Sequence, residues 1–169
     1  LVNHSSKIVI TGGSGFLGSH VADFLSNKGF NVIIYDKKKS KWLKSNQKFI
    51  SGDILNLKKL KKIKIKIDYI YHFAALSDLD TALKNPIESI KINILGTVKL
   101  LKFAVDQKIK RFFLASTIYA NSSQGSFYAA SKKASEEYLR EYSKLYKLKF
   151  TILRFGSLYG ERADKNNGL

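Results

Sequence analysis

The sequence predicts an α/β fold with a doubly wound parallel sheet of about six strands. Short runs of β-branched residues alternate with amphipathic stretches along all 169 residues, which is the pattern of strands separated by helices. Such strands are joined by right-handed crossovers and form a parallel sheet covered by helices on both faces. No internal repeat or low-complexity linker interrupts the pattern, so we expect one domain over residues 1–169.

The individual elements follow from local composition. The expected strands cover residues 7–11, 31–35, 48–50, 67–72, 111–115 and 149–154. The expected helices cover residues 16–28, 56–64, 77–107 and 125–146. The third helix should break near Asn85–Pro86, because proline suits the first turn of a new helix. Apolar residues share a face in helix 16–28 (Leu17, Val21, Phe24, Leu25) and are similarly spaced in helix 125–146 (Ala134, Tyr138, Leu145).

Composition excludes several classes of protein. Hydrophobic residues make up 44% and charged residues 25%, as in ordinary globular domains, which argues against a disordered tail. The chain has no cysteine, so it has no disulfide, thiolate metal site or cysteine nucleophile. No apolar run approaches the roughly 20 residues of a membrane span, and residues 1–7 lack the pattern of a signal peptide. We expect a cytoplasmic protein with no membrane partner and no bound metal.

The net charge of +17 has two interpretations. It comes from 30 basic and 13 acidic residues, and a surface that binds nucleic acid or an anionic membrane would explain it. However, lysines occur throughout the chain, and the densest run, residues 58–66, contains Leu60, Ile63 and Ile65 at the spacing of core positions. We favour a lysine-rich exterior without a nucleic-acid partner, which would still attract small anionic molecules.

A glycine-rich turn, residues 11–18, joins the first strand to the first helix. Gly12, Gly15 and Gly18 are spaced so that backbone can approach a pyrophosphate, which would rest on the amides at the helix start beside Phe16 and Leu17. Glycines also serve bare tight turns. Because this turn follows a strand and opens an amphipathic helix, we favour dinucleotide binding and a Rossmann fold.

Two aspartates follow the next strands. Asp36 lies 18 residues after Gly18, where a carboxylate can accept hydrogen bonds from ribose hydroxyls and repel a 2′-phosphate. It therefore favours NAD over NADP, although Lys37–Lys39 could soften the repulsion. Asp53 follows the third strand and is compatible with either an adenine contact or a plain turn.

Candidate catalytic residues occur in the second half. Tyr128 and Lys132 are four residues apart on one helix and so share a face, where the ammonium group and a cationic nicotinamide would both lower the pKa of the phenol. Ser116 and Thr117 lie just past the fifth expected strand, where ligands bind in such sheets, and one hydroxyl there can hold a substrate oxygen. His72 ends the fourth strand and is more consistent with a structural role than with catalysis.

Together these motifs resemble the extended short-chain dehydrogenase/reductases, specifically the NAD-dependent nucleotide-sugar epimerases and dehydratases. The matches span nearly the whole chain and comprise Thr11–Gly18, Gly52–Asp53–Ile54, His72–Ala75, Asn93, Ser116–Thr117, Tyr128 with Lys132, and Arg154–Gly160. From the motifs and the resemblance, the catalytic residues are Thr117, Tyr128 and Lys132. The residues expected to bind NAD are Gly12, Gly15, Phe16, Leu17, Gly18, Asp36, Asp53, Ile54, Phe73, Ala74, Ala75, Asn93, Ser116, Tyr128, Lys132 and Phe155.

The sequence departs from the family's pattern at two places. In the family's 4,6-dehydratases the active threonine is followed by acidic residues, but here Ile118 and Tyr119 follow Thr117. Ser157 stands where the family usually has an asparagine that meets the substrate diphosphate. The resemblance also implies a smaller C-terminal domain that holds the nucleotide sugar, so we expect the 169 residues to be the cofactor-binding part of a longer enzyme.

The sequence is compatible with three functions. The favoured one is an NAD-dependent epimerase that transiently oxidises a nucleotide-diphosphate sugar to a keto intermediate. The alternatives are an NAD(P)H-dependent reductase of the same fold and a nucleotide-binding protein without catalysis. The resemblance further implies a homodimer through helices 86–107 and 128–146, as in the family.

Overall fold

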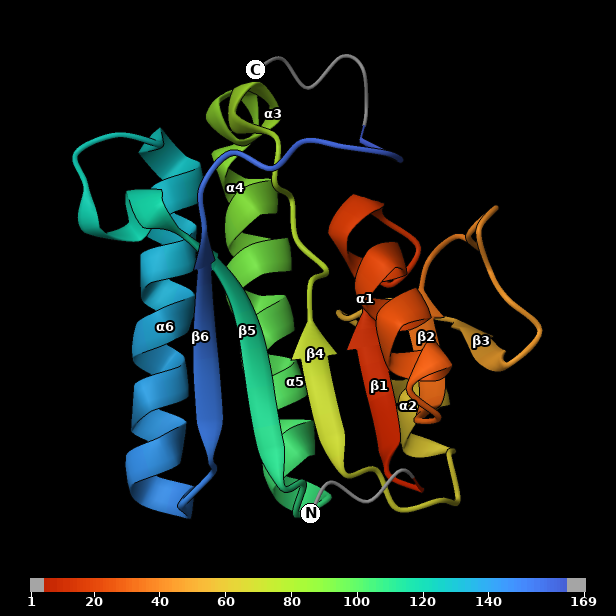
Figure 1. Ribbon diagram of the computed structural model, residues 1–169. Coiled ribbons are helices and arrows are strands. Elements are labelled where there is room, and N and C mark those ends of the chain that lie inside the picture. Colours follow the sequence, from red (N-terminus) through yellow and green to blue (C-terminus); the bar gives the residue numbers. More distant parts are fainter. Residues whose placement is uncertain (1–4, 164–169) are drawn as a thin grey trace.

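A six-stranded parallel sheet in the order β3-β2-β1-β4-β5-β6 forms the centre of the protein (Figure 1). The computed structural model describes residues 5–163. The strands are β1 (Lys7–Thr11), β2 (Asn31–Asp36), β3 (Gln47–Ser51), β4 (Tyr69–His72), β5 (Arg111–Thr117) and β6 (Phe150–Phe155). The chain builds outward from β1 to one edge and then returns to β4, so the predicted doubly wound sheet is confirmed.

The helices agree with the prediction except in the basic segment. They are α1 (Phe16–Asn27), α2 (Lys58–Lys61), α3 (Leu79–Lys84), α4 (Pro86–Ser89), the π-helix η1 (Ile90–Gly96), α5 (Thr97–Asp106), the 3₁₀-helix η2 (Ile118–Asn121) and α6 (Ser126–Tyr146). The predicted break at Asn85–Pro86 is confirmed. The helix expected over residues 56–64 is a single turn, in which Leu60 is the buried residue. Ser116 and Thr117 belong to β5 instead of following it.

Alternate residues of each strand pack on opposite faces of the sheet. Val9 and Ile33 belong to one apolar cluster, together with residues from α2, α5 and α6. Ile8 and Ile34 belong to a second cluster under α1. This alternation is the two-residue period of a strand buried on both sides, and it explains why the central residues of β1 and β2, Ile8–Ile10 and Val32–Ile34, are all apolar.

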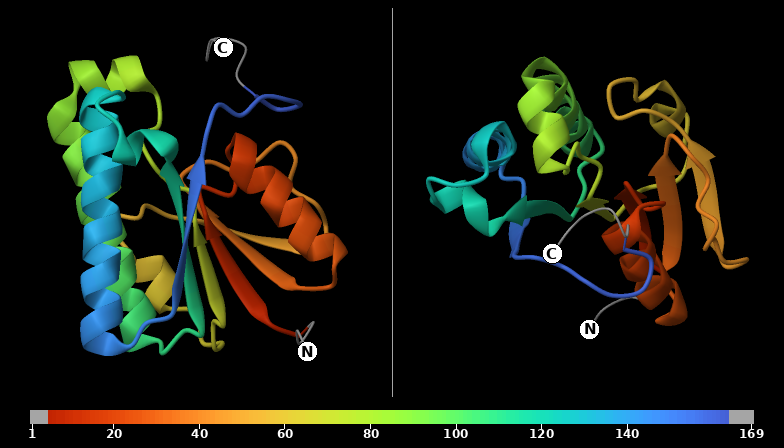
Figure 2. Two further views of the ribbon diagram at one scale, coloured as in Figure 1. Left: turned by 60° about the vertical axis from the view of Figure 1, so that its left-hand side comes forward. Right: turned by 90° about the horizontal axis from the view of Figure 1, so that it is seen from above.

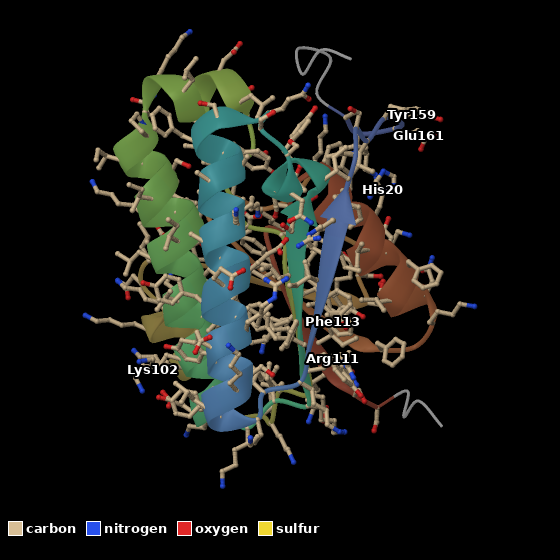
Figure 3. The ribbon with its side chains drawn as sticks, turned by 90° about the vertical axis from the view of Figure 1, so that its left-hand side faces the viewer. His20, Lys102, Arg111, Phe113, Tyr159 and Glu161 are labelled. Carbon is tan, nitrogen blue, oxygen red and sulfur yellow. The ribbon has the colours of Figure 1, made fainter. Side chains whose placement is uncertain are left out.

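Coverage of the two faces is uneven among residues 5–163. The helices α5 and α6 lie on one side of the sheet and α1 lies on the other, next to β1 and β2 (Figure 2). Aromatic side chains line the α1 side of β4 and β5, where the Tyr71 and Phe113 rings stack at 4.1 Å and both residues are only partly buried. Phe113 and Arg111 are labelled along β5 in Figure 3. The expectation of helices over both whole faces is therefore met only in part by the described residues.

The predicted apolar faces of two helices are confirmed only in part. On α1, Leu25 is buried and Val21 packs against the same cluster, but Phe24 is 62% exposed, and the small residues Gly18 and Ala22 complete the buried face. On α6, Tyr138 and Leu145 are exposed, because the buried face of that helix is mostly polar.

Candidate functional site

A cavity of about 870 Å³ opens at the carboxyl ends of the strands, where the sheet changes direction between β1 and β4. Its volume is within the range of small-molecule sites. Most predicted site residues contribute to its wall: Gly12, Gly15, Phe16, Leu17, Gly18, Asp36, Ile54, Phe73, Ala74, Ala75, Ser116, Thr117, Tyr128, Lys132 and Phe155. The topology thus brings residues from seven different segments of the chain to one place.

Two glycines in the turn after β1 are required by the fold. Gly12 has a φ of +71°, and a Cβ atom there would lie 2.5 Å from the backbone nitrogen of Ala74. A Cβ atom on Gly18 would lie 2.2 Å from the carbonyl oxygen of Gly12. Both distances are far below a normal van der Waals contact, so any side chain would push α1 or β4 away from the turn.

Gly15 differs, because the fold itself does not require a glycine there. Its φ of −79° suits any residue, and an added Cβ atom would meet only the Gly12 carbonyl oxygen at 3.4 Å. It is the N-cap residue of α1, whose N-terminus has no side-chain cap and no acidic residue in the first turn. A glycine that leaves this positive helix end bare toward the cavity fits close approach by a diphosphate.

The carboxylate of Asp36 lies beside the glycine turn. It accepts hydrogen bonds from the backbone N–H groups of Ser14 at 3.0 Å and Lys38 at 3.3 Å. Asp36 lines the cavity, in the place that a ribose-binding carboxylate needs. The neighbouring Lys37 ammonium pairs instead with Asp53 at 3.1 Å.

Asp53 itself is not part of the cavity wall, in contrast to its neighbours Gly52 and Ile54. One of its carboxylate oxygens accepts the backbone N–H of Leu55 at 2.8 Å, and the other pairs with Lys37. Burial acts to raise the pKa of Asp53, but these partners hold it below its ordinary value. The carboxylate thus stabilises the turn that places Ile54 in the wall, and the geometry does not support the predicted direct contact with a cofactor.

His72 is a buried structural histidine. Its Nδ1 lies 2.6 Å from the Thr11 hydroxyl, and its Nε2 lies 2.9 Å from the Thr97 hydroxyl. Because Thr97 donates its proton to the Asn93 carbonyl, Nε2 must donate to Thr97 and Nδ1 must accept from Thr11. Burial lowers the pKa of His72 to about 3, so the ring is neutral and joins the end of β1 to α5.

Asn93 is buried on η1 and does not line the cavity. Its side-chain oxygen accepts from the Leu76 N–H at 2.8 Å, and its side-chain nitrogen donates to the Leu76 carbonyl at 3.0 Å and to Ser131 at 2.8 Å. These bonds occupy the amide, so its position does not support the predicted contact with a cofactor. Asn93 instead ties the segment after Phe73–Ala75 to α6.

Thr117, Tyr128 and Lys132 meet at the other end of the cavity. Lys132 is 4% exposed, its Nζ donates to the Ala115 carbonyl at 2.8 Å, and it lies 6.0 Å from the centre of the Tyr128 ring. The Thr117 hydroxyl oxygen accepts the Tyr119 backbone N–H at 3.2 Å, which leaves the hydroxyl proton free. The i, i+4 spacing on α6 therefore produces the shared face that the sequence predicts.

The electrostatics of this end differ from the prediction. Burial lowers the pKa of Lys132 to about 8, against the opposing effect of the Glu136 charge. Burial raises the pKa of Tyr128 above its ordinary value. The sequence predicts that the Lys132 ammonium and a cationic nicotinamide together lower the pKa of Tyr128, whereas in the chain without a dinucleotide the burial of the phenol raises it.

Sequence reasoning missed Glu136, a buried carboxylate behind the cavity. It accepts a hydrogen bond from Ser116 at 2.6 Å and pairs with Arg154 through both of its oxygens. The available signal was its position one helical turn after Lys132, on the same face of α6.

Residues after β6 cross from that strand toward α1 (Figure 1). Gly156, Ser157 and Leu158 line the cavity, so Ser157 reaches the wall at the position where the resemblance expects asparagine. Farther along, the carbonyl of Glu161 lies 2.8 Å from the His20 ring, and Arg162 pairs with Asp23 at 2.8 Å. Figure 3 shows His20, Tyr159 and Glu161 together at this junction.

Within residues 5–163, no group of three or more histidine, aspartate or glutamate side chains could hold a metal ion. The same residues contain no helix both long and apolar enough to cross a membrane.

The chain resembles known nucleotide-sugar enzymes. It is 34% identical to dTDP-D-glucose 4,6-dehydratase of Dictyostelium discoideum, over 92% of this chain and 44% of that protein. The structure matches UDP-glucose 4-epimerase of Thermotoga maritima with UDP-glucose at a TM-score of 0.87 and 31% identity, over 94% of this chain and 58% of that one. It also matches UDP-glucose 4-epimerase of Thermus thermophilus with NAD, at a TM-score of 0.84 and 28% identity over 94% and 57% of the two chains.

The chain thus spans about half the length of these relatives. The model of the NAD dependent epimerase/dehydratase family matches residues 8–169, nearly all of the chain. These residues include the glycine turn, Asp36 and the three residues predicted to be catalytic. The chain therefore belongs to the NAD-dependent epimerase/dehydratase family.

Proposed function

We propose that this chain binds NAD and carries the catalytic groups of a nucleotide-sugar epimerase. The single observation that supports this most strongly is one cavity with two chemically different ends. A bare helix N-terminus and Asp36 lie at one end, and Thr117, Tyr128 and Lys132 lie at the other. A dinucleotide has the matching order of a ribose, a diphosphate and a reactive ring.

The residues present fit NAD at each part of the cavity. The amides that follow Gly15 would hold the diphosphate, and the open space at its missing side chain allows close approach. Asp36 would accept hydrogen bonds from the adenosine ribose, with Ile54 beside the adenine. Lys132 would hold the second ribose and bring Tyr128 next to the reacting carbon. When bound, NAD would supply a hydride acceptor and a positive charge on its nicotinamide ring.

The proton chemistry belongs to the chain's own residues. The Tyr128 oxygen would accept the proton of a sugar hydroxyl while the carbon below it is oxidised. The free Thr117 proton would be donated to the same sugar oxygen and hold it in place. For Tyr128 to act at neutral pH, its pKa must fall from its raised value, and added positive charge in the cavity acts in that direction. Tyr128 would give the proton back to the same oxygen when the keto sugar is reduced again on its opposite face, which would complete epimerisation.

Epimerisation is favoured over dehydration by the residues after Thr117. Ile118 has no ionisable group and Tyr119 has only a phenol. Neither residue therefore provides the carboxylate that could remove and return protons during loss of water. The carboxylates in the cavity wall beyond Asp36 are Asp78, which caps α3, and Asp80.

Product analysis distinguishes the possible reactions. The polypeptide that contains this chain, at its full encoded length, is incubated with NAD and a panel of nucleotide-diphosphate sugars. An epimerase gives an isomer of unchanged mass and no net NADH. A dehydratase product is lighter by one water, and a reductase consumes added NADH. A product lighter by one water would overturn the proposed epimerisation and retain the family assignment.

We also propose a homodimer through helices 86–107 and 128–146. Both regions present exposed large apolar side chains, among them Ile87, Ile90 and Leu95 on the first and Tyr138 and Leu145 on the second. Pairing of these faces with a second copy would remove them from water. Light scattering over a range of protein and salt concentrations should give twice the chain mass, and a monomer throughout would contradict the proposal.

A further inference from the structure

Glu136 is the most completely paired charge in the described part of the chain. Its side chain is 2% exposed, and it lies on α6 behind the cavity. One oxygen accepts from Ser116 at 2.6 Å and from the Arg154 Nε at 2.9 Å. The other accepts from the Arg154 Nη2 at 2.5 Å and from Arg140 at 3.2 Å. Together these donors use the acceptor capacity of a carboxylate.

These bonds determine where the proton of Ser116 points. Burial acts to raise the pKa of Glu136, but Arg154 and Ser116 hold it below its ordinary value, so the group is an ionised acceptor. Ser116 must therefore donate to Glu136, and only its lone pairs remain for a ligand. Thr117 has the opposite arrangement, since its oxygen accepts the Tyr119 N–H and its proton is free.

Glu136 also balances the charge of Lys132. The Lys132 ammonium donates to a backbone carbonyl, and no ion pair joins it to a carboxylate among residues 5–163. Tyr128 on α6, Tyr119 on η2, and Asp78 and Asp80 line the same cavity as Lys132. The other titratable or charged groups on this side are the neutral His72 on β4, whose pKa is lowered by burial and by the Lys132 charge, and Glu136 with its partner Arg154 on β6. Of these anions, Glu136 is the one whose charge acts on the Lys132 pKa, and it raises it.

We propose that Glu136 is a positioning residue for the reaction at Thr117, Tyr128 and Lys132. It holds the Ser116 proton away from the cavity, so that Thr117 is the donor of the hydroxyl pair, and it supplies the negative charge that keeps Lys132 protonated. The consequence for turnover rests on the proposed function, whereas the proton and the charge can be measured without turnover.

The first test replaces the charge with an isosteric neutral group, Glu136→Gln. The readout is the pH dependence of Lys132 acylation by acetic anhydride, followed by mass spectrometry on the 169-residue chain without NAD. Side chains at i and i+4 are roughly 5–6 Å apart at their Cβ atoms, so loss of one charge should lower the midpoint by about one pH unit or more. Glu136→Asp keeps the charge, so its Lys132 midpoint should lie close to the wild-type value.

Glu137→Gln is the matched control. Glu137 is 64% exposed and pairs with the same Arg140, but solvent screens it from the cavity. An unshifted Lys132 midpoint in folded Glu136→Gln, or an equal shift in Glu137→Gln, overturns the charge role.

A second measurement needs no variant. In an H₂O/D₂O mixture, slow exchange of a hydroxyl proton splits the ¹³Cβ resonance of its serine or threonine. The ¹³Cβ resonance of Ser116 should be split, because Glu136 holds the hydroxyl proton in a buried hydrogen bond. The ¹³Cβ resonance of Thr117 should be a single line. A single line for Ser116 overturns the assignment of its proton, even where Glu136→Gln does not fold.

Turnover separates this inference from the proposed function. In the full-length polypeptide, Glu136→Gln should lower kcat about tenfold or more with little change in the Kd for NAD, and Glu137→Gln should leave both unchanged. Absence of turnover in the unmodified protein would overturn the proposed function, while the Lys132 midpoint and the Ser116 splitting would still test Glu136. Unchanged kcat and pH–rate profile in an active, folded Glu136→Gln variant would overturn the positioning role.

Discussion

The two ends of the cavity are built in different ways. The end formed by β1, α1 and β2 depends on missing side chains, since Gly12 and Gly18 let backbone segments touch. The end formed by β5, α6 and β6 depends on charged groups, chiefly the buried Lys132 and Glu136 and the Arg154 that pairs with Glu136. Adding side-chain atoms should therefore disrupt the structure and binding of the first end, and removing charges or protons should disrupt the chemistry of the second.

The largest effect is expected at the backbone end, from Gly18→Ala. The new Cβ atom would lie 2.2 Å from the Gly12 carbonyl oxygen, which cannot move without displacing the turn. The cost in unfolding free energy should reach or exceed about 3 kcal/mol, the upper part of the range for overpacking, and NAD binding should be lost. Thermal unfolding and calorimetric titration with NAD measure the two effects.

Gly15→Ala is the matched control for that variant. Its Cβ atom meets only the Gly12 carbonyl oxygen at 3.4 Å, so the melting temperature should change little. NAD affinity should nevertheless fall about tenfold or more, roughly 1.4 kcal/mol, because the methyl group occupies the approach to the helix N-terminus. Wild-type affinity in Gly15→Ala would contradict the assignment of the diphosphate to this turn.

At the charged end, the largest effect is expected from Tyr128→Phe. The ring and its packing remain, and only the titrating oxygen is lost. NAD affinity should stay nearly unchanged, while kcat should fall by about 10²- to 10⁴-fold if Tyr128 is the general base. The measurement uses the full-length polypeptide with a nucleotide sugar that it turns over. An undiminished kcat would show that Tyr128 is not the general base.

The contrast between the two ends also explains how much could be predicted from the sequence. The backbone end was predicted in detail, since glycines at this spacing between an apolar strand and an amphipathic helix are typical of a dinucleotide-binding turn. On α6 the apolar pattern pointed to Tyr138 and Leu145, which are exposed, because the buried face carries Ser131, Lys132, Ser135 and Glu136. A hydrophobic period cannot detect a helix face whose burial depends on hydrogen bonds to neighbouring elements, here η1, β5 and β6.

Motif matching had a different limit. It placed Asp53 and Asn93 correctly in the chain, but a motif does not give the direction of a side chain. Asp53 turns toward Leu55 and Lys37, and Asn93 turns toward Leu76 and Ser131. Both shape the cavity from behind its wall.

The pH dependence of stability provides a further test of the charged end. The pKa of Lys132 is about 8 in the folded chain and 10.5 as the ordinary value, so between these pH values the unfolded chain binds one more proton. The free energy of unfolding should therefore rise with pH across this window, by on the order of 3 kcal/mol from this group. Below pH 8 both states are protonated and the cost of burying the cation is fully present.

Lys132→Met removes this dependence. Denaturant unfolding is measured from pH 7 to 10.5 for both proteins, and the difference between them cancels the other titrating groups. The variant should gain stability relative to the wild type at pH 7 and lose that advantage toward pH 10.5. Parallel stability curves would show that Lys132 has an ordinary pKa in the folded chain.

The smallest effect is expected at the backbone end, from Asp36→Ala. Its carboxylate is the acidic group next to the glycine turn, where it would accept hydrogen bonds from the ribose and repel a 2′-phosphate. Lys37, the closest candidate to soften that repulsion, is paired with Asp53. The variant should bind NAD about tenfold more weakly and NADP more tightly, a change of roughly 1.4 kcal/mol for NAD.

Asp53→Ala is the control for this variant. It would free Lys37 and should strengthen NADP binding while leaving the ribose contact to NAD in place. Calorimetric titration of all three proteins with both dinucleotides gives the comparison, and tighter binding of NADP than NAD by the unmodified chain would contradict the role of Asp36.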